Sequence, residues 1–270
     1  MPISIKNLPN QSKVSSIEPA TINVLIKGKG WQLLPFSFGN IEDYIIDAND
    51  NQNPNKFFTK KYLADNSWLT SNTQVISIEP EIINVKVERG YSKKVKISPD
   101  VNLFFKDGFG LVSDIVCFPD SVQILGPWSK TILIDEIKTE KTILNELESS
   151  QSVKLKLMKP EYIVLDKEET EISFSVERIV DKRFDQIEIN KINVPADREL
   201  ILSPSKISVV LKGGIQKLAN MKTEDLQVVI DYNQALTDSV GTLEPIVNHE
   251  KYFEVIDIIP NKIKYIIKQF

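Results

Sequence analysis

The chain has 270 residues and a net charge of −4, and its acidic and basic residues are interleaved. This pattern argues against a nucleic-acid-binding protein, because such proteins need a basic stripe to neutralise phosphates. The sequence contains no run of about 18 apolar residues, so it predicts no membrane-spanning segment. Its length favours two or three domains, because one small core rarely organises so many residues.

The chain opens directly with a strand pattern, in which Ile3 and Ile5 alternate with polar residues. No signal peptide precedes this strand. The abrupt start suggests that a targeting segment or an anchor has been removed upstream. A naturally short start is the alternative.

One pattern recurs along the chain and is typical of a β protein. At five places a proline precedes apolar residues at every second position, which is the period of a strand with one buried face. After Pro80, for example, Ile83, Val85 and Val87 fall on one face. Proline fixes φ and lacks an amide donor, so it suits the entry to a strand rather than its middle. The five prolines are Pro19, Pro80, Pro119, Pro204 and Pro260.

Short motifs also recur at the spacing of one small domain. Val87-Glu88-Arg89 returns 89 residues later (176 − 87) as Val176-Glu177-Arg178. Two further pairs are Asn7-Leu8-Pro9 with Asn193-Val194-Pro195, and Ile45-Ile46-Asp47 with Val229-Ile230-Asp231. These repeats predict an all-β fold of three tandem small domains with at most short helices. The predicted domains are residues 1–90, 91–178 and 179–270, and the short polar links between them, 89–93 and 178–184, are predicted to bend.

Three local signals depart from the strand pattern. Asn55 is a suitable cap for a short helix that runs through Phe58, Tyr62 and Leu63. Asp107-Gly108 lies between apolar runs and predicts a hairpin. Residues 131–147 partly fit a helical period and predict a second helix.

The sequence offers few candidates for catalysis or metal binding. His249 is the only histidine and lies in a polar turn, so a catalytic triad or dyad has little to draw on. Cys117 is the only cysteine and lies in an apolar run typical of a core. Zinc sites normally use several such ligands. We therefore expect no enzymatic activity, no cofactor and no bound metal.

Two further motifs match binding loops only in part. The segment from Asp47 to Gln52 begins like a calcium loop, but Gln52 and Phe58 stand where a glycine and a glutamate are required. Gly28-Lys29-Gly30 begins like a dinucleotide fingerprint, but Leu33 occupies the third glycine position. We interpret the first motif as a polar turn and reject the second.

Trp31 and Trp128 are the candidate partner-contact residues. Each follows a glycine that ends a central strand, and tryptophan is enriched in the hot spots of interfaces. The alternative is that both are aromatic plugs that close the ends of small cores. Trp68 has no such counterpart, and core packing is expected for it.

The repeats are similar to one family. The third predicted domain contains a strand from Pro204 to Gly213, then Met221-Lys222-Thr223-Glu224 and Val229-Ile230-Asp231. The second contains the strand after Pro119 and Ile137-Lys138-Thr139-Glu140, and the first contains the strand after Pro19 without a Lys-Thr-Glu segment. This order of motifs resembles the YbbR domain over nearly the whole chain.

The resemblance implies tandem all-β domains that follow one N-terminal membrane helix and lie outside the cytoplasmic membrane. The sequence shows no such helix, so either this is a soluble piece of a longer protein or the membrane assignment does not apply here. The best-known members of the family regulate a membrane diadenylate cyclase, which makes cyclic di-AMP, and the family has no catalytic residues to carry over. The predicted function is that of an envelope-exposed regulatory or scaffold protein with a membrane partner. The alternative is a structural or adhesive β-repeat protein of the cell surface, which binds a polymer or another surface protein.

Overall fold

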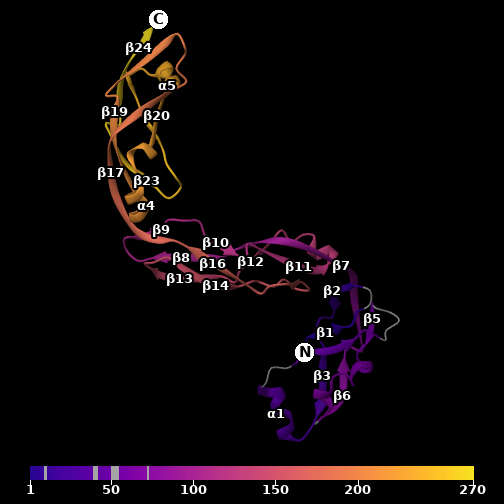
Figure 1. Ribbon diagram of the computed structural model, residues 1–270. Helices are drawn as coiled ribbons and strands as arrows, with labels where there is room; N and C mark the ends of the chain where they lie inside the picture. Colours follow the sequence, from indigo (N-terminus) through magenta and orange to yellow (C-terminus); the bar gives the residue numbers. More distant parts are fainter. Residues whose placement is uncertain (9–10, 39–41, 50–54, 72) are drawn as a thin grey trace. The chain divides into compact units, whose positions relative to one another are not determined.

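The computed structural model describes residues 1–8, 11–38, 42–49, 55–71 and 73–270, and it is all-β (Figure 1). Its α-helices are short, and α1 (Gly30–Phe38) has nine residues. This confirms the predicted fold class. Among the described residues, no helix combines the length and the hydropathy that a membrane span requires.

The chain packs as two compact units, each of which draws on separate stretches of sequence. The first unit comprises Met1–Pro99, Phe118–Glu140 and Leu155–Thr170. The second comprises Asp100–Cys117, Lys141–Lys154 and Glu171–Phe270. The division into three domains at residues 90 and 178 stays a prediction.

The first unit is built around the long strand β7 (Ile82–Ser98), which pairs with β2, β5, β11 and β12. Strands β3 and β6 form an antiparallel pair, and β1 and β4 form a parallel pair. The other strands of this unit are β1 (Ile3–Lys6), β2 (Ser12–Glu18), β3 (Asn23–Lys27), β4 (Tyr44–Asp47), β5 (Lys56–Phe58), β6 (Gln74–Glu79), β11 (Ser121–Pro127), β12 (Glu136–Lys138) and β15 (Val164–Leu165). Its short helices besides α1 are α2 (Ser67–Thr70), α3 (Trp128–Thr131) and the 3₁₀ turn Thr59–Tyr62.

The second unit is built in the same way around β17 (Val176–Ile192), which pairs with β9, β19 and β20. Strand β24 lies between β18 and β21, and β8 pairs with β13. The other strands are β8 (Val101–Phe105), β9 (Phe109–Leu111), β13 (Thr142–Leu147), β18 (Arg198–Ser203), β19 (Lys206–Gly214), β20 (Gln227–Asp231), β21 (Thr242–Leu243), β22 (Ile246–Asn248), β23 (Glu254–Ile259) and β24 (Ile263–Gln269). The helices are α4 (Ile215–Asn220), α5 (Tyr232–Thr237) and the 3₁₀ turn Thr223–Asp225. Strands β10 (Val116–Phe118), β14 (Gln151–Lys156) and β16 (Glu169–Phe174) contain residues of both units.

All five prolines that precede a predicted strand lie in turns that lead from one strand into the next. Each follows a cis peptide bond, and the residue before each proline is the last residue of a strand. Two such turns lie close together in each unit. In the second unit β18 pairs with β24 while β19 pairs with β23, so both chain segments change sheet at Pro204 and Pro260. The strand after Pro204 buries alternate residues, as the period of two predicts, since Ile207, Val209 and Leu211 are all buried. After Pro260, Ile263 is buried but Ile267 is exposed.

The repeated motifs of the sequence form the same contact twice. Asn7 donates from Nδ2 to Asp47 Oδ2 (2.8 Å) in the first unit, and Asn193 donates from Nδ2 to Asp231 Oδ1 (3.0 Å) in the second. Both asparagines have a positive φ, which asparagine tolerates better than most residues. Each pair joins the ends of two parallel strands, β1 with β4 and β17 with β20.

The structure corrects three local predictions. Residues 56–58 form strand β5, so the helix expected after Asn55 is reduced to the 3₁₀ turn Thr59–Tyr62. The helix predicted over 131–147 is wrong, because β12 and β13 in this segment pair in parallel with β7 and β8. The Asp107-Gly108 turn is present with a positive φ at Gly108, but β8 pairs with β13 and β9 with β17. In each case a partner strand far along the chain overrides a local preference. Of the calcium-loop-like motif, residues 50–52 lie outside the described residues.

Candidate functional site

The segments predicted as bending links lie inside continuous strands rather than in loops, and their bending stays a prediction. Strands β7 and β17 have 17 residues each. Strand β7 pairs with β2 as far as Arg89 and with β11 from Gly90 onward. Strand β17 pairs with β9 as far as Arg178 and with β19 from Ile179 onward. The polar side chains of these segments favoured the prediction of a loop, but their backbone groups form hydrogen bonds with neighbouring strands.

At each change of partner the glutamate of the Val-Glu-Arg motif accepts a hydrogen bond from the start of a short helix. The amide of Ser129 in α3 donates to Glu88 Oε2 (3.0 Å). The amide of Gln216 in α4 donates to Glu177 Oε2 (2.9 Å), and Lys217 N lies 3.5 Å from the same oxygen. Amides in the first turn of a helix have no partner within the helix, and the helix dipole favours a negative charge there.

A lysine five residues further along the same strand bonds to the other end of the helix. Lys93 Nζ donates to the carbonyl oxygen of Ile132, which directly follows α3 (2.9 Å). Lys182 Nζ donates to the carbonyl oxygens of Leu218 and Met221 at the end of α4 (3.1 Å to Met221). Carbonyl groups in the last turn carry the negative end of the helix dipole. One strand therefore supplies a charge of the favourable sign to each end of the helix.

A tyrosine segment completes both arrangements. The segment Tyr162-Ile163 lies against Gly126, where an added Cβ would be 2.4 Å from Ile163 Cδ1. The segment Tyr252-Phe253 lies against Gly213 in the same way, with Phe253 Cδ1 at 2.5 Å. The third helix residue is a lysine whose Nζ lies over the tyrosine ring in both cases, 4.1 Å from the ring centre for Lys130 over Tyr162 and 5.2 Å for Lys217 over Tyr252. We call these arrangements the Glu88 joint (Glu88, Lys93, α3, Gly126, Tyr162) and the Glu177 joint (Glu177, Lys182, α4, Gly213, Tyr252).

The electrostatics of the two joints differ around the tyrosine. Hydrogen bonds from the hydroxyl and the amide of Ser129 are the main causes that lower the pKa of Glu88 to about 2, and Lys86 adds an ion pair at 3.0 Å. Tyr162 packs against the buried core of the first unit. Tyr252 instead donates its hydroxyl to Asp114, whose carboxylate also pairs with Lys251 Nζ (2.7 Å). The hydrogen bond from Lys251 is the largest cause that lowers the pKa of Asp114, and the hydrogen bond from Tyr252 is the next largest.

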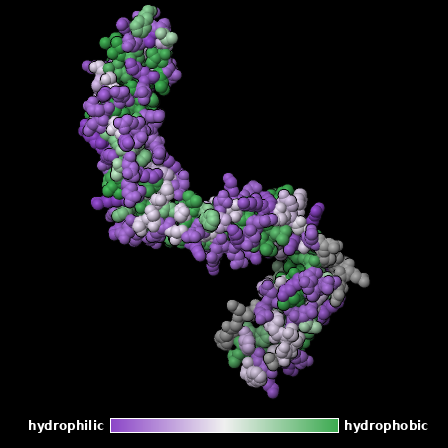
Figure 2. All heavy atoms as spheres, in the orientation of Figure 1, coloured by the Kyte–Doolittle hydropathy of each residue, from purple (hydrophilic) through white to green (hydrophobic). Residues whose placement is uncertain are grey.

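The two candidate tryptophans are exposed and lie at the starts of helices. Trp31 is 67% exposed in α1, and Trp128 is 53% exposed at the first residue of α3. Ile215 occupies the corresponding first position of α4 and is 45% exposed. Hydrophilic residues cover much of the face shown in Figure 2. The structure therefore places these side chains at the surface rather than in core plugs. Trp68 is partly buried and packs against the first core, as expected.

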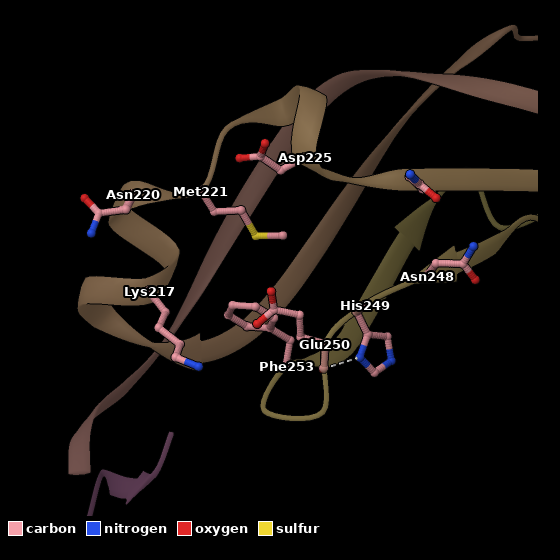
Figure 3. Close-up of a pocket in the computed structure, with 9 residues that line it drawn as sticks. Lys217, Asn220, Met221, Asp225, Asn248, His249, Glu250 and Phe253 are labelled. Carbon is pink, nitrogen blue, oxygen red and sulfur yellow. Dashed lines mark hydrogen bonds between the residues drawn. The ribbon is translucent and has the colours of Figure 1, made fainter. Parts of the chain in front are cut away.

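The second unit also has an open hollow of about 670 Å³ beside α4 (Figure 3). It is lined by Lys217, Asn220, Met221, Asp225, Gln227, Asn248, His249, Glu250 and Phe253. The exposed His249 has Nδ1 2.9 Å from the carbonyl oxygen of the adjacent Glu250. Cys117 lies half-buried in β10, outside this lining, rather than deep in a core as predicted. Within the described stretches, no group of three or more His, Cys, Asp or Glu side chains is arranged to hold a metal.

Sequence reasoning found part of the candidate site. Glu88 and Glu177 were visible as members of a repeated motif, but their contacts were not predicted. Lys93 and Lys182 are also 89 residues apart (182 − 93), so the spacing of the first motif extends to them. The sequence did not predict the roles of Tyr162 and Tyr252. The available signal was a tyrosine followed by a large apolar residue in both repeats, and the structure packs that apolar residue on a glycine.

The chain was compared with known proteins at the level of sequence and structure. No family model matches it, and no curated protein matches it. Among solved structures, the crystal structure of a YbbR-like protein from Streptococcus pneumoniae TIGR4 matches with 11% sequence identity and a TM-score of 0.31. The match covers 67% of this chain and 97% of the other. The description of that protein names the family that the repeated motifs of this sequence resemble.

Proposed function

We propose that this protein is a non-enzymatic scaffold or regulatory protein that binds a protein partner through apolar side chains at the starts of its short helices. The observation that carries the proposal is the exposure of Trp31 and Trp128, joined by Ile215 at the equivalent position. Large apolar side chains exposed at corresponding places in successive repeats are costly to leave in water, and tryptophan is frequent in interface hot spots.

The partner that we propose is a membrane-embedded diadenylate cyclase, with this chain on the outer side of the cytoplasmic membrane. The resemblance of the repeats to the YbbR domain supports this identity. We propose a non-enzymatic role because the sequence offers one histidine, one cysteine and no intact catalytic motif.

Binding to a diadenylate cyclase reconstituted in nanodiscs tests the proposal. The wild-type chain should bind, and Trp31→Ala with Trp128→Ala should weaken the affinity by a factor of about 30 or more, as the loss of hot-spot residues does. The matched control is Val240→Ala, which shortens a side chain that is 75% exposed outside these helices. This control should bind like the wild type.

Two outcomes would contradict the proposal. The first is no binding of the wild-type chain to the cyclase together with binding to a cell-surface polymer, which would favour the structural or adhesive alternative. The second is unchanged affinity in the double tryptophan variant, which would remove these side chains from the interface.

A further inference from the structure

The two joints share one set of contacts although their helices differ in sequence. Helix α3 reads Trp-Ser-Lys-Thr and α4 reads Ile-Gln-Lys-Leu-Ala-Asn, so only the third residue is the same. Both helices donate a backbone amide at the start and accept at backbone carbonyls at the end, and α3 adds the hydroxyl of Ser129 as a second donor to Glu88. A glutamate and a lysine five residues apart on one strand can therefore hold helices of different sequence in the same way.

Neither helix can hold its own conformation. Helices α3 and α4 have four and six residues, whereas isolated helices shorter than about 12–15 residues are marginal in water. The position of each helix must come from contacts with the rest of the fold. At both joints these contacts include one strand side chain at each end of the helix, with the sign of charge that the helix dipole favours.

The geometry points to a positioning role for the pairs Glu88–Lys93 and Glu177–Lys182, each of which holds one short helix by both ends and fixes its exposed first side chain. Those side chains are Trp128 in α3 and Ile215 in α4. The Val-Glu-Arg motif and the lysine that follows it thus hold a short helix in place. That the presented side chains meet a partner rests on the proposed function, whereas the holding of the helices does not.

Packing at the Glu177 joint is consistent with this role. An added Cβ at Gly214, the residue directly before α4, would lie 2.4 Å from Glu177 Oε2. The carboxylate therefore occupies the space that a side chain would take at this position. The position just before α3 is Pro127, which has no amide that could compete for Glu88.

Amide hydrogen exchange in the full chain tests this positioning role directly. In Glu88→Ala the amide of Ser129 should exchange faster by a factor of about five, the effect expected for loss of a helix cap, while the amide of Gln216 keeps its rate. In Glu177→Ala the pattern should reverse. The amide side chain of Gln retains an acceptor oxygen, so Glu88→Gln and Glu177→Gln should restore most of the protection. The matched control is Glu81→Ala, because Glu81 is exposed and pairs with Lys60 away from both joints.

The reciprocal design separates positioning from general stability. A variant that only destabilised its fold would speed exchange broadly, and the Gln variants would not be distinguished from the Ala variants. Either result would overturn the proposal, as would an unchanged rate at Ser129 in Glu88→Ala. Fluorescence anisotropy of Trp128, in a Trp31→Phe and Trp68→Phe background, should fall in Glu88→Ala and recover in Glu88→Gln.

Binding to the reconstituted cyclase then distinguishes the two proposals. If Trp128→Ala weakens binding, Glu88→Ala should also weaken it and Glu88→Gln should restore it. Weak binding of Trp128→Ala with unchanged binding of Glu88→Ala would overturn the positioning role and leave the proposed function standing. If Trp128→Ala binds normally, the exchange rates and the anisotropy alone decide the positioning role, and the double variant Trp31→Ala with Trp128→Ala decides the proposed function.

Discussion

The Glu88 joint and the Glu177 joint share their helix contacts and differ in how the tyrosine is anchored. At the Glu88 joint Tyr162 packs on an apolar core, and the carboxylate with the strongly lowered pKa is Glu88 itself. At the Glu177 joint the hydroxyl of Tyr252 bonds to Asp114, which also pairs with Lys251. The shared contacts use backbone amides and carbonyls of the helix, which remain when its side chains change to any residue other than proline. The variable part uses side chains, which can diverge from one repeat to the next.

The largest expected effect comes from the glycines under the tyrosine segments. Gly126→Ala should destabilise the fold by about 2–3 kcal/mol, because the added Cβ meets Ile163 at 2.4 Å and the carbonyl oxygen of Tyr162 at 3.0 Å. Gly213→Ala should cost about 1–2 kcal/mol, because its closest neighbours belong to the ring of Phe253 rather than to the backbone. Urea unfolding measures both.

Gly30→Ala is the matched control for these two variants. No atom lies within 4 Å of an added Cβ at this position, so its stability should stay within about 0.5 kcal/mol of the wild type or rise slightly. Equal losses in all three variants would show that backbone freedom, not the tyrosine segment, sets the requirement for glycine.

Substitution of Lys182 or Lys93 should have the next largest effect on the free energy of unfolding. Lys182→Met should cost about 1.5 kcal/mol, because Lys182 donates to two carbonyl groups and its Nζ lies 4.6 Å from the ring centre of Phe184. Lys93→Met should cost about 0.5–1 kcal/mol, because Lys93 donates to one carbonyl group and pairs with the exposed Asp135 at 3.5 Å. Thermal unfolding of both variants checks the order, and a larger loss at Lys93 would contradict it.

Acid should weaken the two joints through different carboxylates. The folded-state pKa of Glu88, about 2, lies below its ordinary value of 4.5, so Glu88 contributes stability above pH 4.5 that is lost as the pH falls toward 2. Glu88→Gln should remove this part of the pH dependence of the urea midpoint. At the Glu177 joint, Lys251 and Tyr252 hold the pKa of Asp114 below 3.8, so Asp114→Asn should remove a contribution that is present above pH 3.8 and lost below it. An unchanged acid profile in Glu88→Gln would show that the bond to Ser129 adds no pH-dependent stability.

The smallest expected effect on stability belongs to the exposed side chains. Trp31→Ala, Trp128→Ala and Ile215→Ala should each change the free energy of unfolding by less than about 0.5 kcal/mol, because all three residues lie at the surface. A core plug would lose about 3–5 kcal/mol on the same truncation of a tryptophan. Melting experiments on the three variants distinguish these cases, and a large loss at Trp128 alone would set the Glu88 joint apart from the Glu177 joint.

The sequence by itself determined the elements whose signals are local. The period of two after Pro80 and Pro204 predicted strands, and those strands bury the expected faces because alternation depends only on the residues of the strand itself. The paired motifs around Asn7 and Asn193 likewise predicted a repeated structure, and each asparagine bonds to the aspartate of the second motif.

Only the tertiary structure decided which strands pair and which residues meet at the joints. Residues 131–147 partly fit a helical period, but this segment forms β12 and β13, which pair with β7 and β8. Glu88 and Ser129 are 41 residues apart in the sequence, and Glu177 and Gln216 are 39 apart. No local pattern encodes such a contact, because its donor is a backbone amide that every residue except proline possesses. The exposure of Trp31 and Trp128 was likewise left open by the sequence, because a tryptophan after a glycine fits a surface as well as a core until the neighbouring strands are in place.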